Sequence, residues 1–239
     1  MPATPTITRP QRDAWPQLKF GLMLHWGLYS VAGGVWKDRR IPDYNEQIKT
    51  LKGFSTHIHI DLMDGQFAPT KSPDLNHIWW PPECTADIHL MYQRPMEHID
   101  QLIKLKPRVV IIHNEADVHH MDFAARLHAA GIEAGLAILH DTPAEYTFQI
   151  LHSFDHVLIF SGNLGYQGGS TADLGCLDKV TQIKQQHPEV EIGWDGGINQ
   201  LNVKLLVEGG VDILNVGGFI KNADDPRNAY ATLKSEITS

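Results

Sequence analysis

The chain has 239 residues, a mass of 26.8 kDa and a formal net charge of −8. Hydrophobic residues make up 42% of it and charged residues 20%, which excludes a disordered or coiled-coil chain. The negative charge argues against nucleic-acid binding, and no apolar run is long enough to span a membrane. Residues 1–6 lack the pattern of a secretory signal, and the two cysteines, Cys84 and Cys176, cannot build a disulfide framework. We therefore expect a cytoplasmic protein.

Seven short apolar or β-branched runs recur along the chain, and each is followed by loop residues and then by helical periodicity. They end about 26 residues apart, which is the size of a strand-plus-helix unit. Val109–Ile112 and Val157–Phe160 are continuously apolar, as in parallel strands that are buried on both faces. The predicted strands are Thr56–Asp61, Cys84–His89, Val109–His113, Glu133–Leu139, His156–Ser161, Glu191–Asp195 and Ile213–Gly217.

One more strand at the N-terminus would make eight, which predicts an α/β fold of the (β/α)8 TIM-barrel type in a single domain over residues 1–239. An open doubly wound sheet is the alternative, but the glycine-rich turns come late in the chain. Thr4–Thr8 and Phe20–Trp26 compete for the first strand, and about 30 residues, roughly 10–42, are surplus to one βα unit. Helices are predicted at Asp43–Lys52, at Asp117–Ala130, from Thr142 onward and at Asn199–Glu208.

Four polar residues lie at the ends of three predicted strands. His59 and Asp61 are two residues apart, so both side chains point to the same face of their strand. His89 and Asp195 end two other strands, and barrel enzymes keep their catalytic groups at such ends. Two imidazoles and two carboxylates are suitable ligands for a divalent transition metal.

Glycine clusters follow the last three predicted strands. Glycines allow backbone N–H groups to turn toward an anion, and barrels often bind phosphate after their seventh and eighth strands. The residues that we expect to contact phosphate are Gly165, Gly168, Gly169, Gly196, Gly197, Gly217 and Gly218.

Four segments together resemble the signature of the ribulose-phosphate 3-epimerase family: His59–Pro69, Asp87–Met91, Trp194–Ile198 and Asn215–Gly218. The resemblance covers about residues 1–9 and 43–239, with Thr6 in the place of a first-strand serine. It implies one divalent metal ion (zinc, iron, manganese or cobalt) on His59, Asp61, His89 and Asp195. It also implies acid/base roles for Asp61 and Asp195, and a Met63–Met91 cluster under the substrate. The loop at residues 162–170 departs from the family, which leaves the sugar open.

The surplus segment resembles a different family. Lys19–Val31 and Gly34–Lys37 are similar to the first-strand region of the alpha-L-fucosidases, in which a His-Trp pair, here His25 and Trp26, helps to hold fucose. The match covers only about 30 residues and brings no counterpart of that family's nucleophile. We interpret it as a foreign βα piece, introduced by engineering or recombination, with a lineage-specific loop as the alternative. We expect it to perturb the catalytic face without fucosidase activity.

The resemblance implies an isomerase that epimerises a ketopentose phosphate, ribulose 5-phosphate or xylulose 5-phosphate. Two alternatives stay open: another phosphosugar epimerase or aldolase of the same barrel group, and an inactive chimeric scaffold. The expected partner is a small phosphosugar, with no nucleic acid and no membrane, and a homo-oligomer is compatible with the sequence.

Overall fold

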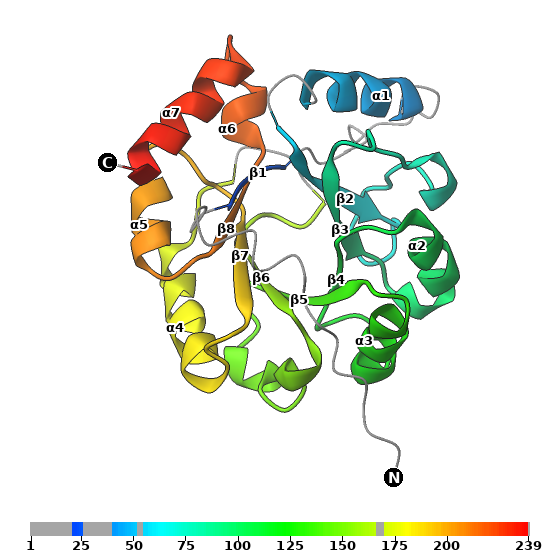
Figure 1. Cartoon of the computed structure of the whole chain (residues 1–239). Helices are drawn as coiled ribbons and strands as arrows, with labels where there is room; N and C mark the ends of the chain where they lie inside the picture. The colour runs from blue at the N-terminus through cyan, green and yellow to red at the C-terminus, as the bar shows by residue number, and fades with distance from the viewer. Residues whose placement is uncertain (1–20, 26–39, 52–54, 166–169, 239) are drawn as a thin grey trace.

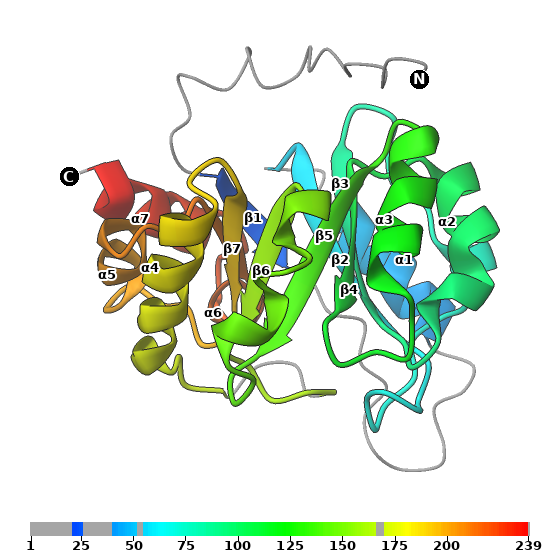
Figure 2. The ribbon, with the colours of Figure 1, turned by 90° about the horizontal axis from the view of Figure 1, so that it is seen from below.

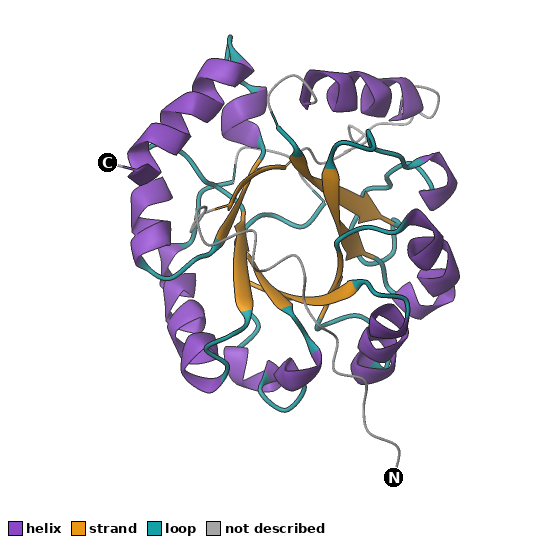
Figure 3. Cartoon of the chain, in the orientation of Figure 1, coloured by secondary structure: helices purple, strands orange, loops and turns teal. Residues whose placement is uncertain are grey.

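The structure, a computed structural model, describes residues 21–25, 40–51, 55–165 and 170–238. Eight parallel strands close into a barrel in the order β1 to β8, and the helices surround it (Figures 1 and 3). This confirms the predicted (β/α)8 barrel. The strands are β1 Gly21–His25, β2 His57–Met63, β3 Thr85–Met91, β4 Val109–His113, β5 Glu133–Leu139, β6 His156–Phe160, β7 Glu191–Asp195 and β8 Ile213–Val216.

The helices flank the barrel wall on its outside, as the view from the side shows (Figure 2). Within the described residues, none of them is long and apolar enough to cross a membrane. The α-helices are α1 Arg40–Leu51, α2 Ile99–Leu105, α3 His120–Ala129, α4 Leu177–Gln186, α5 Val203–Glu208, α6 Gly218–Lys221 and α7 Pro226–Thr238. Short 3-10 helices are η2 Leu75–His77, η3 Pro95–His98, η4 Ala144–Thr147, η5 Leu151–Ser153 and η6 Leu174–Cys176.

The α-helix predicted from Thr142 onward is wrong, because two short 3-10 helices, η4 and η5, occupy this stretch. The hydroxyl of Thr147 donates to the carbonyl oxygen of Ala144 at 2.7 Å. Hydrogen bonds of this kind compete with the regular helical pattern, and aromatic and β-branched residues such as Tyr146 and Thr147 are weak helix formers. A proline in a position typical of the first turn of a helix is therefore not sufficient to predict an α-helix here.

The first strand of the barrel is β1, which lies within the second of the two competing segments. Gly21 to Leu24 pair with Ile213 to Val216 of β8, and Leu24 and His25 pair with Ile58 and His59 of β2. These two ladders close the ring. Thr4–Thr8, and with it Thr6, lies outside the described residues, as does Trp26.

Alternate residues of each strand face opposite sides of the barrel wall. The outward-facing set, which includes Ile88, Val110 and Trp194, packs in one large core between the strands and the helices. A separate, small apolar cluster fills the middle of the interior, and it consists of Val109, Ile111, Ala137 and Leu158.

The amino ends of the strands carry a buried ionic network around Arg108, which precedes β4. Its Nε atom lies 2.7 Å from Asp87 Oδ1, and its Nη1 atom lies 3.0 Å from Glu133 Oε2 and 2.9 Å from Glu191 Oε1. His156 adds a contact of 2.8 Å from its Nδ1 atom to Glu191 Oε1. This network forms the floor of the barrel.

Two of the floor carboxylates, those of Glu191 and Asp87, are ionised in spite of their burial. Burial opposes ionisation of Glu191, but the Arg108 guanidinium and His156 lower its pKa to about 2. Burial likewise opposes ionisation of Asp87, and Arg108 and His57 hold its pKa well below the usual range. A carboxyl whose pKa is lower in the folded than in the unfolded chain stabilises the fold above its ordinary pKa of 4.5, and this contribution disappears as the pH falls toward 2.

We predict that Arg108→Met lowers the free energy of unfolding at pH 7 by about 3–5 kcal/mol, because it leaves buried carboxylates without their cation. Urea unfolding measures this value. The control is Arg126→Met, which breaks an ion pair between side chains that are 51% and 79% exposed and should cost less than about 1 kcal/mol. The gap between wild type and Arg108→Met should shrink as the pH falls from 5 to 2, and a gap that does not depend on pH would contradict the electrostatic explanation.

Candidate active site

Four polar side chains meet inside the barrel at the carboxyl ends of three strands. His59 and Asp61 come from β2, His89 from β3 and Asp195 from β7. All four are buried, and one ligand atom from each lies within 4.8 Å of the others. The structure thus brings together the four residues that the strand ends predicted.

Two measured spacings within this cluster fit a bound metal ion. Asp61 Oδ1 lies 3.3 Å from His59 Nε2 and 2.7 Å from His89 Nδ1. Two donors that share one ion, each about 2.0–2.2 Å from it, lie at most about 4.4 Å apart. Imidazole nitrogens with carboxylate oxygens are a donor set that suits zinc, iron, manganese and cobalt.

His89 is linked to a second histidine at the carboxyl end of the neighbouring strand β4. His89 Nε2 lies 2.8 Å from Nε2 of His113, the last residue of β4, and His113 Nδ1 lies 3.4 Å from Glu115 Oε2. Glu115 Oε1 accepts from the backbone N–H of Leu139, at 3.2 Å, and from the hydroxyl of Thr142. A polar chain therefore runs from the cluster to the end of β5.

These polar contacts determine which nitrogen atoms of the two histidines carry protons. Burial lowers the pKa of His113 to about 4, so that its imidazole is neutral at pH 7. Burial opposes ionisation of Glu115, but contacts with His113 and Thr142 hold its pKa below the usual value. An ionised carboxylate can only accept a hydrogen bond, so the nearby Glu115 favours the form of His113 whose proton is on Nδ1 and whose Nε2 atom accepts from His89.

His89 Nδ1 then faces Asp61 Oδ1 at 2.7 Å, and in a neutral His89 both atoms are acceptors. Two acceptors at this distance repel each other unless a positive charge lies between them. Either a proton on His89 or a metal ion can supply that charge. The geometry of the cluster is therefore compatible with a bound metal ion.

Apolar side chains cover one side of the cluster. Met63 and Met91, the last residues of β2 and β3, pack together with Ala68, and Phe67 and Leu164 lie against them. The methionine cluster that the family resemblance implied is therefore present.

Phe160 ends β6 and is not among the predicted site residues. Its ring centroid lies 5.6 Å from that of His89 and 5.7 Å from that of His113. Its place at a strand end is the signal that could have identified it.

The predicted glycines gather after β6, β7 and β8, which are neighbours in the barrel. Gly196 and Gly197 have φ values of +114° and +70°. A Cβ atom on Gly196 would lie 2.3 Å from the backbone nitrogen of Gly162, and one on Gly197 would lie 2.0 Å from that of Ala172. Close approach of two loops therefore requires glycine at both positions.

Two further predicted glycines follow β8 directly: Gly217, and Gly218 at the start of α6. Gly165 has a φ of +80°, and its carbonyl oxygen accepts from the Thr70 hydroxyl at 2.9 Å. Gly168 and Gly169 lie outside the described residues.

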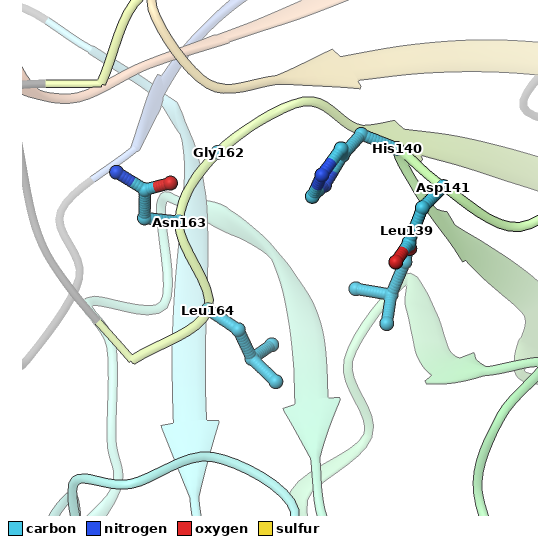
Figure 4. Close-up of a pocket in the computed structure, with 6 residues that line it drawn as sticks. All are labelled: Leu139, His140, Asp141, Gly162, Asn163 and Leu164. Atoms are coloured by element: carbon cyan, nitrogen blue, oxygen red, sulfur yellow. The ribbon is translucent and has the colours of Figure 1, made fainter.

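A pocket of about 470 Å³ opens between the ends of β5 and β6 (Figure 4). The imidazole of His140 and the side chain of Leu164 point into the space between the two segments. His140 and Asp141 are not among the predicted site residues, although two polar residues directly after a predicted strand are a signal for such a place. The lining residues are Leu139, His140, Asp141, Gly162, Asn163 and Leu164.

A closed (β/α)8 barrel with a buried polar cluster at the carboxyl ends of its strands has the build of a barrel enzyme. The particular family follows from comparison of sequences: the chain belongs to the Ribulose-phosphate 3 epimerase family, whose profile matches residues 40–220. β1 precedes the matched region.

Individual relatives agree with this family. The ribulose-phosphate 3-epimerase of Schizosaccharomyces pombe is 29% identical over 196 residues, which cover 79% of this chain and 85% of the relative. That of Mycobacterium bovis is 30% identical over 186 residues, which cover 75% and 81%. The solved structure of 3-hexulose-6-phosphate synthase from Salmonella typhimurium shares the fold, with a TM-score of 0.65 and 15% identity, and covers 91% of this chain and 99% of that one.

We predict that the purified protein binds one zinc or cobalt ion at the cluster and that Glu115→Gln weakens this binding about 10–100-fold, the usual effect of losing a group that orients a ligand. The glutamine amide can present an N–H to His113 Nδ1 and so reverse the hydrogen bonds that leave His89 Nδ1 unprotonated. Competition with a chelating dye measures the affinity. Thr142→Val, which removes only a support of Glu115, is the control and should change it much less. Equal affinities for Glu115→Gln and wild type would refute this role of Glu115.

Proposed function

We propose that this protein epimerises a ketopentose phosphate, interconverting ribulose 5-phosphate and xylulose 5-phosphate. The observation that carries the proposal is the buried set of two aspartates and two histidines at the mouth of a barrel of this family. His59, Asp61, His89 and Asp195 would hold one divalent metal ion. When bound there, a metal supplies the positive charge that stabilises negative charge developing on the substrate oxygens.

The two aspartates are the proposed acid/base pair. Asp61 is on β2 and Asp195 is on β7, three places away around the ring through β1 and β8, so the two carboxylates reach the mouth from different parts of the wall. One carboxylate removes the proton from the carbon beside the carbonyl, and the other returns a proton to the opposite face. The configuration at that carbon is thereby inverted, with no net change in atoms.

The remaining residues would bind the sugar and its phosphate. Met63 and Met91 would lie under the carbon chain. The phosphate would bind at the glycine turns after β6, β7 and β8, where Gly165, Gly168, Gly169, Gly196, Gly197, Gly217 and Gly218 are the proposed contacts. Thr6 has no proposed place in this account, because β1 supplies the first strand.

We further propose that residues 1–239 form one domain in which about residues 10–42 replace the family's first βα segment. The alpha-L-fucosidase resemblance of this segment, with His25 and Trp26 as a vestigial sugar-binding pair, remains a prediction, as does its foreign origin. A cytoplasmic location and a homo-oligomer also remain predictions. Two alternatives remain: another phosphosugar epimerase or aldolase of the same barrel group, and an inactive scaffold.

We predict that Asp61→Asn and Asp195→Asn each lower kcat about 10²–10⁴-fold, because each removes one positioned acid or base. Turnover of both pentulose phosphates, exchange of solvent deuterium into the substrate and metal content are measured together. Asp122→Asn, in an exposed residue of α3, is the control and should keep full turnover. Near-normal deuterium exchange in both active-site variants would contradict the assignment. Turnover of a hexulose phosphate alone would favour another epimerase, and an inactive wild type would favour a scaffold.

We predict that deletion of residues 10–42 abolishes cooperative folding, because it removes β1 and opens the ring between β8 and β2. Thermal unfolding and epimerase turnover measure the effect. A folded, active deletion variant would mean that residues 1–9 can supply the first strand.

The intact chain should not hydrolyse a fucoside, because glycoside cleavage normally needs a flanking pair of carboxylates that this segment does not bring.

A further inference from the structure

The side chain of Asn215 on β8 is a buried polar group that the proposed acid/base chemistry does not use. Asn215 is 1% exposed. Within the part of the chain that the structure describes, neither its Oδ1 nor its Nδ2 atom has a hydrogen-bond partner. Buried amides in folded proteins are almost always hydrogen-bonded, because an unsatisfied donor or acceptor destabilises the fold. The amide of Asn215 therefore calls for a partner beyond these described residues, and a bound ligand can supply it.

The register of the barrel places Asn215 beside the candidate active site. Asn215 is the direct partner of Asp195 in the ladder between β7 and β8. Residues paired in this way in neighbouring parallel strands lie on the same face of the sheet. The residues before and after it, Leu214 and Val216, pack in the outer core together with Trp194, so Asp195 and Asn215 share the inner face.

Packing does not explain an asparagine at this place. The inward-facing residue one step deeper on the same strand is Ile213, which is buried and apolar. Asparagine is among the residues that are depleted in strands. A valine or threonine would fill a buried strand position without an unsatisfied amide.

The chemistry of the amide indicates what it would bind. An asparagine side chain offers a donor and an acceptor side by side. A phosphate would use only the donor and a metal ion only the acceptor. A hydroxyl next to a carbonyl uses both, because the carbonyl oxygen accepts and the hydroxyl donates.

We infer that Asn215 is a substrate-binding residue that holds the carbonyl oxygen and the neighbouring hydroxyl of the ketopentose phosphate beside Asp195. The Nδ2–H group donates to the carbonyl oxygen, and Oδ1 accepts from the hydroxyl. This inference rests on the proposed epimerase function, and it adds the residue that orients the reacting carbons toward the acid/base pair.

The test compares Asn215→Val with Asn215→Thr, two side chains of nearly the same shape that differ by a methyl and a hydroxyl group. Loss of two hydrogen bonds should lower kcat/KM of Asn215→Val about 10–100-fold, mainly through a higher KM. Asn215→Thr should recover part of this loss, because its hydroxyl both donates and accepts. The metal content should stay unchanged in both variants.

Thermal unfolding separates binding from structure. The ligand-free Asn215→Val protein should unfold at the same temperature as wild type or higher, because an unsatisfied amide is gone, while the stabilisation by added ribulose 5-phosphate should decrease. Wild-type kcat/KM in Asn215→Val would overturn the inference, and so would a lower unfolding temperature with equal loss of activity in both variants. An inactive wild type would instead overturn the proposed function on which the inference rests.

Discussion

Side chains alternate between the two faces of each strand, and the eight strands close into a ring. The interior of the barrel therefore has space for only a few side chains at each level. Arg108 and its carboxylates occupy the lowest level, the cluster around Ile111 the middle, and Asp61 and Asp195 the mouth. Because the middle level is apolar, the charged levels are separated by a region of low dielectric constant, and each must balance its own charge. At the floor, the guanidinium of Arg108 balances the charge of the carboxylates around it. At the mouth, where the residues are imidazoles and carboxylates, the balance falls to protons or a metal ion.

The loops above the strands brace one another around this mouth. Asp64 Oδ2 accepts from the backbone N–H of Gln93 at 2.7 Å, which ties the loop after β2 to the loop after β3. Thr70 and Gly165 join the loops after β2 and β6. Hydrogen bonds within the protein thus fix the loops around the cluster relative to one another.

Features that depend on the local pattern of apolar and polar residues could be predicted from the sequence. Val109–His113, Glu133–Leu139 and Glu191–Asp195 were predicted with the bounds that the structure has, and the four clustered residues followed from their places at strand ends. Contacts between distant strands were not predictable in this way. Thr4–Thr8 and Phe20–Trp26 have similar local patterns, and only the pairing with β8 and β2 distinguishes them.

The same limit applies to the residues around the cluster. The contact of His113 with His89 and the buried amide of Asn215 depend on which strands are neighbours in the ring, so no window of sequence contains them. The wrong prediction of an α-helix after β5 has a different cause. A side-chain hydrogen bond favours 3-10 turns there, although a proline stands where a helix often begins.

The position of β1 has a consequence for how such barrels diversify. Ring closure at β8 and β2 is made by backbone hydrogen bonds, which depend on chain direction and register and not on side-chain identity. The region that matches the family begins at residue 40, after β1, so the strand that completes the ring lies outside it. The ring therefore constrains the sequence of β1 less than that of β2, β3 and β7, which carry the polar cluster, because it needs from β1 only an extended backbone in the right direction and register. Sequence change in such a barrel is thus easiest at a strand that closes the wall without contributing to the cluster.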